Sequence, residues 1–466
     1  MNELSMITAT DLVDRYRSNT VSPVEATEAA LQAIEQFQDR VNAFVLVDPD
    51  GALAVAAESE RRWQQGRPLG PLDGVPMSIK DIFLTDGWPT LRGSKLIDKA
   101  GPWTEDAPAV ARLRAGGAVF LGKTTTPEYA WKGVTDSPAY GATGNPWDAH
   151  HHAGGSSGGS ATAVGLGMGP VSIGTDGGGS VRIPASFTGT TALKPTYGLI
   201  PMYPPSPFGT LSHAGPMTRT VADAAILLDL ITGFDHRDWS AMPTPQGSFA
   251  DGLGDGVEGL RIGFSADLGY GRNAPGVLAA VRDAVTVFAE AGAQVTEVDP
   301  GFADPVEAFH VLWFSGAAKV LQGHDEEFDS IDPGLRRIVE TGRGFNASDY
   351  LDATAVRMAM GVTMGAFHTD YDLLITPTMP ITSFGTERQA PEGWPSQLWT
   401  SWTPYTYPFN MTQQPALSVP CGFSDGLPVG LQIVGPRHAD RLVLRAGQAF
   451  QDRTDWHLRL PNLITG

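Results

Sequence analysis

Two serines in glycine-rich segments and one upstream lysine are the residues of this chain best suited to covalent chemistry. Ser156 lies in AGGSSGGS, Ser180 lies 24 positions later in GTDGGGSVR, and Lys80 precedes both in GVPMSIKD. A nucleophilic serine needs a base, and it needs hydrogen-bond donors for the oxyanion that forms when it attacks a carbonyl. Glycine-rich turns can aim consecutive backbone N–H groups at one point. The pattern therefore predicts acyl transfer.

Three segments resemble the amidase signature hydrolases. They are GVPMSIKD around Lys80, GGSSGGS around Ser156, and GTDGGGSVRIPASFTGTTALKPT around Ser180. The likeness continues through residues 197–220 and returns in QQPALSVPCGFSDGLPVGLQIVG, so it covers most of the chain in the expected order. The combination of segments is specific, whereas one glycine-rich loop alone would indicate little.

The resemblance implies a Ser–Ser–Lys triad. Ser180 would be the nucleophile, Ser156 the bridging serine in a cis peptide, and Lys80 the final base. A free lysine has a pKa near ~10.4, and burial would lower that value. Neutral Lys80 would accept a proton from Ser156, which would accept one from Ser180. A covalent acyl-enzyme would form, and water would hydrolyse it through the same relay.

The loop around Ser180 is expected to stabilise the oxyanion. Its donors would be four consecutive backbone N–H groups, those of Gly177, Gly178, Gly179 and Ser180. Asp176 and Arg182 resemble family positions that hold this loop by hydrogen bonds. The family usually has a bulkier residue at the position of Gly177. This departure is expected to loosen the loop or to enlarge the acyl side of the pocket.

Aromatic residues are candidates for an apolar substrate pocket. Those selected as substrate contacts are Tyr129, Trp131, Trp313, Trp399 and Trp402. The alternative is ordinary packing in the core, which is the more common role for the cluster near the C-terminus. If the residues line a pocket, aryl or bulky apolar substrates are favoured.

Composition excludes several classes of function. The 466 residues are 42% hydrophobic and carry a net charge of −19, which favours a large core and disfavours nucleic acid or anionic membranes as partners. The single cysteine, Cys421, permits no intrachain disulfide and lies in an apolar run typical of a buried, inert thiol. The N-terminus lacks the apolar core of a signal peptide, so a cytoplasmic location is expected.

No metal or cofactor is expected. The run His150-His151-His152 lacks carboxylates or cysteines at metal-binding spacing, so it indicates a solvated loop. The glycine-rich segments match neither the P-loop motif nor the dinucleotide-binding motif.

A single amidase domain over residues 1–466 is expected. It would comprise N-terminal helices in 1–40, the signature core at about 71–220, and the rest of the sheet with pocket loops in 260–466. Ser22-Pro23-Val24-Glu25 predicts a capping box at the start of a helix. From about residue 71, short apolar runs alternate with helical segments. That alternation predicts an α/β fold with a large mixed, mostly parallel β-sheet covered by helices on both faces.

The leading functional interpretation is an amidase that hydrolyses C–N bonds of small or aryl carboxamides. Carbamates (urethanes) and esters pass through the same tetrahedral oxyanion and fall within this prediction. One alternative is the glutaminase-like subunit of a tRNA-dependent amidotransferase, which carries an acidic residue where this chain has Thr403-Pro404. A non-catalytic scaffold is disfavoured because all three triad positions are present. Homodimers are common in the family, so a homodimer is an open expectation.

Overall fold

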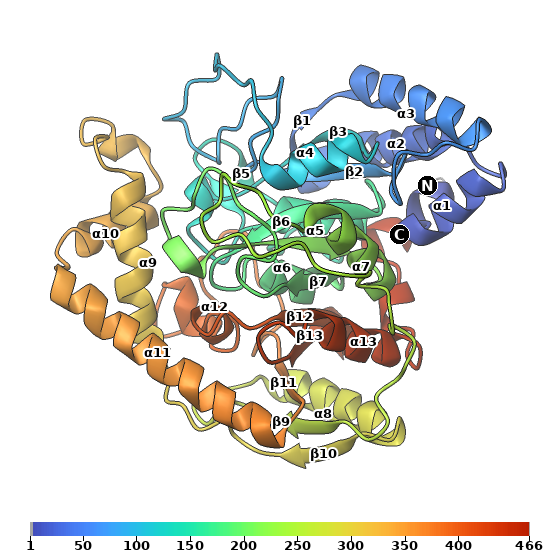
Figure 1. The fold of residues 1–466 in the computed structure, drawn as a ribbon. Coiled ribbons are helices and arrows are strands. Elements are labelled where there is room, and N and C mark those ends of the chain that lie inside the picture. Colours follow the sequence, from blue (N-terminus) through green and yellow to red (C-terminus); the bar gives the residue numbers. More distant parts are fainter. Residues whose placement is uncertain (1–2, 466) are drawn as a thin grey trace.

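A computed structural model describes residues 3–465. Within them, eleven strands form one sheet that crosses the molecule (Figure 1). Their spatial order is β1 (Phe44–Val47), β3 (Val119–Thr124), β2 (Pro76–Lys80), β6 (Val171–Asp176), β8 (His213–Thr218), β7 (Thr191–Lys194), β12 (Ala416–Ser424), β13 (Leu427–Val434), β11 (Leu373–Pro377), β9 (Arg261–Phe264) and β10 (Gln294–Glu297). A separate two-stranded ribbon joins β4 (Asp136–Ser137) to β5 (Gly141–Ala142).

The sheet is mixed, as expected, but the prediction that it is mostly parallel is wrong. Of the ten strand pairings in the described sheet, four are parallel. The other six are antiparallel. One reason is the hairpin between β12 and β13, whose turn residues Asp425 and Gly426 both have positive φ, at 53° and 78°. Asp-Gly is typical of such two-residue turns, which join antiparallel strands.

Helices cover both faces of the sheet, which confirms the α/β prediction. The first face packs against α1 (Ala9–Arg17), α4 (Pro108–Ala115), α7 (Val221–Ile231), α8 (Pro275–Glu290) and α13 (Asp440–Gln451). The second face packs mainly against α2 (Pro23–Val41), α3 (Pro49–Gln64), α5 (Gly158–Gly165) and α6 (Arg182–Thr188). A further apolar cluster contains residues of α9 (Val306–Val320), α10 (Pro333–Gly342), α11 (Ala347–Asp370) and α12 (Pro408–Met411). In Figure 1, α9, α10 and α11 gather at one side of the molecule.

Short helical turns complete the described chain. They are η1 (Glu3–Met6), η2 (Glu128–Ala130), η3 (Gly209–Leu211), η4 (Phe328–Ser330), η5 (Trp399–Trp402), η6 (Trp456–Leu458) and α14 (Asn462–Thr465). None of the helices in this part of the chain is both long enough and apolar enough to cross a membrane.

The predicted capping box at the start of α2 is present. The Glu25 N–H donates to Ser22 Oγ at 3.1 Å, and the Ser22 N–H donates to the Glu25 carboxylate at 2.8 Å. These two bonds satisfy two of the N–H groups that a helix leaves free at its start.

The expected core and the C-terminal remainder share the same sheet. They meet where β7 pairs with β12, with Leu193 opposite Leu417. The glycine- and proline-rich segment 233–259 between them contains no described helix or strand. The prediction of one domain is therefore compatible with the topology and stays a prediction.

The order of the strands places Lys80, Ser156 and Ser180 near one edge of the sheet. Parallel neighbours β2 and β6 end at Lys80 and Asp176. Because the carboxyl ends of parallel strands meet at the same edge, the loops beyond them converge there. Ser156 and Ser180 each lie two residues before a helix, α5 and α6 respectively.

Candidate active site

Lys80 lies buried among three hydroxyl groups. Its Nζ is 2.6 Å from Ser156 Oγ, 2.9 Å from Ser157 Oγ and 2.8 Å from Thr175 Oγ1. Burial lowers the pKa of Lys80 well below its ordinary value, and the charge of Asp176 only partly opposes that shift. A neutral amine in this position can accept a proton from the hydroxyl beside it.

Lys80 forms no ion pair with the adjacent Asp81. Asp81 follows the last residue of β2 and directs its carboxylate to other partners. Its Oδ1 lies 3.3 Å from Lys123 Nζ, and the Tyr140 hydroxyl donates to its Oδ2 at 2.7 Å. No carboxylate within residues 3–465 lies at ion-pair distance from Lys80, so hydroxyl groups are its immediate partners.

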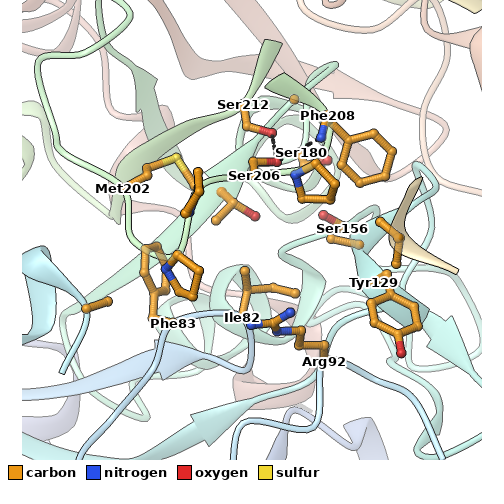
Figure 2. Close-up of a pocket in the computed structure, with 18 of the residues that line it drawn as sticks. Ile82, Phe83, Arg92, Tyr129, Ser156, Ser180, Met202, Ser206, Phe208 and Ser212 are labelled. Carbon is orange, nitrogen blue, oxygen red and sulfur yellow. Dashed lines mark hydrogen bonds between the residues drawn. The ribbon is translucent and has the colours of Figure 1, made fainter. Parts of the chain in front are cut away.

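Both predicted catalytic serines line one cavity (Figure 2). The peptide bond between Gly155 and Ser156 is cis, as the resemblance implied. The Ser180 carbonyl accepts the Ser157 N–H at 3.0 Å, which ties the two serine segments together. Ser180 Oγ makes no hydrogen bond with any of the described residues. The hydrogen bond between Ser180 and Ser156 that proton transfer needs is therefore not formed in this geometry. Catalytic hydrogen bonds often tighten only when substrate is bound.

Asp176 and Arg182 form the predicted pair, fully buried beneath the Ser180 loop. Arg182 donates to both carboxylate oxygens, from Nε at 3.0 Å and from Nη2 at 2.9 Å. Burial by itself raises the pKa of Asp176, but the charge and hydrogen bonds of Arg182, with a further bond from Asn410, hold it below the ordinary value. The carboxylate therefore stays ionised.

Sequence reasoning missed the second layer of this support. Asn410 Nδ2 donates to Asp176 Oδ1 at 2.8 Å, and Arg182 donates to Asn410 Oδ1 at 2.7 Å and to Gln432 Oε1 at 2.8 Å. These partners lie more than 200 positions from the loop in sequence. No local pattern could identify them.

The prediction for the oxyanion donors needs one correction. The Gly179 N–H donates to Asp176 Oδ1 at 2.8 Å, so it is already used to hold the loop. Gly179 has φ of 130°, a conformation suited to glycine. Three candidate donors remain, the N–H groups of Gly177, Gly178 and Ser180.

The cavity has a volume of about 180 Å³ and a largely apolar lining. A segment that sequence reasoning missed forms much of the wall, namely 201–208, with the sequence PMYPPSPF. Its dense prolines after the glycine-rich motif were the available signal, since such stretches form ordered surface loops. Arg92 was also missed, although it lines the same cavity (Figure 2).

Only two of the five predicted aromatic contacts line the cavity within the described chain, namely Tyr129 and Trp313. The other three are corrected, because they are packed in the core. Trp402 is fully buried. Trp131 and Trp399 contact Trp313, which lines the cavity. The Trp313 indole N–H donates to the Trp131 carbonyl at 3.1 Å, and the Trp313 and Trp399 rings lie 5.8 Å apart.

Gly177 does not enlarge the pocket, contrary to expectation. A Cβ at this position would lie 2.7 Å from Trp313 Cζ3, so the indole fills the space that a side chain would occupy. At Gly178 a Cβ would lie 2.5 Å from Trp399 Cη2. Two glycines and two tryptophans thus fit together at the wall beside Ser180.

The remaining candidates, His151, His152 and Cys421, have surroundings typical of structural residues. His151 Nδ1 lies 2.9 Å from Asp148, and His152 Nε2 lies 2.8 Å from the Arg388 carbonyl. Across residues 3–465, no group of side chains has the composition of a metal site. Cys421 is buried, and burial raises the pKa of its thiol, which makes it a poor nucleophile.

Comparisons with known proteins show related sequences and structures. A sequence model of the family described as Amidase matches residues 25–444. An acylamidase of Rhodococcus erythropolis is 39% identical over 469 residues, which cover 98% of both chains. A glutamyl-tRNA(Gln) amidotransferase subunit of Chloroflexus aurantiacus is 37% identical over the whole of both chains. The crystal structure of a bacterial aryl acylamidase of the amidase signature family has a TM-score of 0.88, 31% identity and 97% coverage of each chain.

Proposed function

The chain belongs to the amidase signature family of hydrolases, which cleave C–N bonds in amides. From that membership we propose that it is a stand-alone amidase that acts through Lys80, Ser156 and Ser180. The observation that carries the proposal is the position of the Lys80 amine. It is buried, lies 2.6 Å from Ser156 Oγ, and forms no ion pair with a carboxylate in the described chain.

The proposed reaction begins with proton transfer along the relay. Ser156 gives its hydroxyl proton to Lys80 Nζ and takes the proton of Ser180, whose Oγ attacks the amide carbonyl carbon. The C–N bond then breaks as the relay returns a proton to the leaving amine. Water repeats the sequence on the acyl-enzyme, which releases the carboxylic acid and restores Ser180. Each half-reaction returns the relay to its starting protonation state.

Backbone N–H groups would stabilise the oxyanion in both half-reactions. The candidates are the N–H groups of Gly177, Gly178 and Ser180, on the loop that Asp176 and Arg182 hold in place. Fixed donors of this kind lower the barrier because they need no rearrangement as charge develops on the carbonyl oxygen.

The aromatic lining of the cavity supports the proposal that the substrate carries an aryl or bulky apolar group. Trp313 and Phe208 are stacked with ring centroids 3.9 Å apart, and both line the cavity. Flat apolar walls of this type bind rings by burying their faces. We extend the proposal to aryl esters and carbamates, because they form the same tetrahedral intermediate.

The amidotransferase subunit remains the second candidate, because relatives with that name match the whole chain. The cavity favours the first candidate. Among the described residues no Asp or Glu lines it, so the α-ammonium group of glutamine would have no carboxylate partner there. Thr403, which stands where those relatives are expected to carry an acid, is buried away from the cavity.

A hydrolysis panel tests the proposal. Acetamide, acetanilide, an aryl ester, an aryl carbamate and glutamine are offered to the wild type, to Ser180→Ala, and to Ser18→Ala as a remote exposed control. We expect turnover of the anilide and a fall of about 10³-fold or more in Ser180→Ala alone. Turnover of glutamine only would favour the amidotransferase function, and an active Ser180→Ala would exclude the assigned nucleophile.

A further inference from the structure

Arg92 places a guanidinium group at the cavity that contains Ser180 and Ser156 (Figure 2). Its side chain is largely buried, yet it makes no hydrogen bond or ion pair with any residue in the part of the chain that the structure describes. Arginines removed from water are normally paired, because an isolated buried charge is costly. An unpaired guanidinium facing a substrate cavity is therefore a candidate ligand-binding group.

Asp81, the carboxylate that acts electrostatically on Arg92, is engaged by other groups. Asp81 already accepts the Leu91 N–H at 3.2 Å and the Tyr140 hydroxyl at 2.7 Å, and it lies 3.3 Å from Lys123 Nζ. Two cationic side chains, Arg92 and Lys123, thus share the influence of one carboxylate. Among the described residues that line the cavity, Arg92 is the only charged one, so it gives this wall a positive charge.

The backbone fixes the position of Arg92. Its φ is 55°, and that of Tyr129 is 49°, both in a left-handed region that residues other than glycine seldom adopt. The Tyr129 N–H donates to the Arg92 carbonyl at 2.7 Å, which couples the two segments. Gly93 follows with φ of 70°, and a Cβ there would lie 2.6 Å from the Thr126 carbonyl oxygen. Unusual backbone held by its surroundings is a common feature of ligand sites.

We propose that Arg92 binds a carboxylate carried by the substrate, so that the preferred substrates are amides with an anionic group. The guanidinium presents a planar fork of N–H donors that matches a carboxylate. The inference rests on the proposed function, because it places the anionic subsite and the nucleophile Ser180 in one cavity. The carboxylate belongs either to the acyl part or to the amine part of the amide.

Matched substrates test the proposal. N-phenylsuccinamate carries the carboxylate on its acyl part, and 4-acetamidobenzoate carries it on its amine part. Each is compared with its neutral isostere, in which a carboxamide replaces the carboxylate, by the release of the aromatic amine. We expect the wild type to prefer one of the two anions over its isostere by about 10- to 100-fold in kcat/KM, the range for a hydrogen bond to a charged group.

Variants of Arg92 locate the origin of that preference. Arg92→Gln should abolish the preference for the anion, so that the anion and its neutral isostere are cleaved with similar kcat/KM. Arg92→Lys should retain part of the preference, because it keeps the charge and loses the fork. Arg67→Gln, at an exposed arginine, serves as the control and should leave the preference unchanged.

The failure of this proposal can be distinguished from failure of the proposed function. If the wild type cleaves neutral anilides but shows no preference for either anion, or if Arg92→Gln keeps the preference, the carboxylate subsite is wrong and the amidase proposal stands. If no amide is cleaved, the carboxylate subsite can still be tested by measuring the affinity for benzoate by calorimetry. Weaker binding to Arg92→Gln than to the wild type supports the subsite, and equal binding overturns it.

Discussion

Lys80 differs from two other lysines that are equally buried in this protein. Lys123 lies beside Asp81, and burial lowers its pKa to about 8 against the pull of that carboxylate. Lys194 donates to backbone carbonyls, those of Pro195 and Gln414. Lys80 faces hydroxyl groups instead, which stabilise an ammonium ion less than a carboxylate does. This contrast makes Lys80 the buried lysine best placed to act as a base.

The pH dependence of the reaction should report Lys80. A base works only when it is neutral, which requires a pH above its pKa. Because burial lowers that pKa, activity should persist at neutral pH. It should fall tenfold per pH unit once the pH drops below the lowered pKa. The measurement is kcat/KM for an anilide against pH. A rate that rises toward acid would exclude a neutral lysine base.

Gly177 and Trp313 should behave as a coupled pair. In Gly177→Ala the new Cβ would lie 2.7 Å from the indole, and overpacking of this kind should lower kcat/KM for an anilide by about tenfold or more. Trp313→Leu in the same chain removes the contact and should restore part of that loss. Gly361→Ala on α11, where a Cβ meets nothing within 4 Å, is the matched control. Additive effects of the two substitutions would show that they do not interact.

At the scale of elements, the Ser180 loop depends on α6 and on the distant segment that contains Asn410. Arg182 begins α6 and joins that segment to Asp176 through fully buried hydrogen bonds. Removal of one partner of a buried ion pair leaves the other charge uncompensated, which is strongly destabilising.

Arg182→Leu should lower the free energy of unfolding by about 3–5 kcal/mol. Arg282→Leu is the control, because the pair of Arg282 with Glu297 is exposed and should be worth less than about 1 kcal/mol. Urea denaturation of both variants provides the comparison. Similar losses in the two would mean that the buried pair gives the loop no special support.

Local signals predicted local features of the elements well. The capping box at Ser22 and the Asp176–Arg182 pair both follow from residues close together in sequence. The parallel character of the sheet was overestimated, because strand direction depends on which distant strands pair. The wall formed by 201–208 and the role of Trp313 likewise depend on long-range packing, which a single sequence does not specify.

At the scale of the whole molecule, the sheet makes the signature core and the C-terminal part interdependent. β7 of the core pairs with β12, and residues of both strands enter the same apolar core on the first face. If the chain is one domain, heating should give a single transition whose calorimetric and van't Hoff enthalpies agree. Two separate transitions would instead divide the chain near residues 233–259.

The nucleophile itself can be identified by trapping the acyl-enzyme. Wild type, Ser180→Ala and Ser157→Ala are mixed with 4-nitrophenyl acetate, quenched with acid in the first turnover, digested and mapped by mass spectrometry. An activated ester acylates quickly, so the intermediate should accumulate. The predicted result is one acetyl group on Ser180 in the wild type and in Ser157→Ala, and none at this site in Ser180→Ala. An acetyl group on Ser156 or Ser157 in place of Ser180 would contradict the assigned nucleophile.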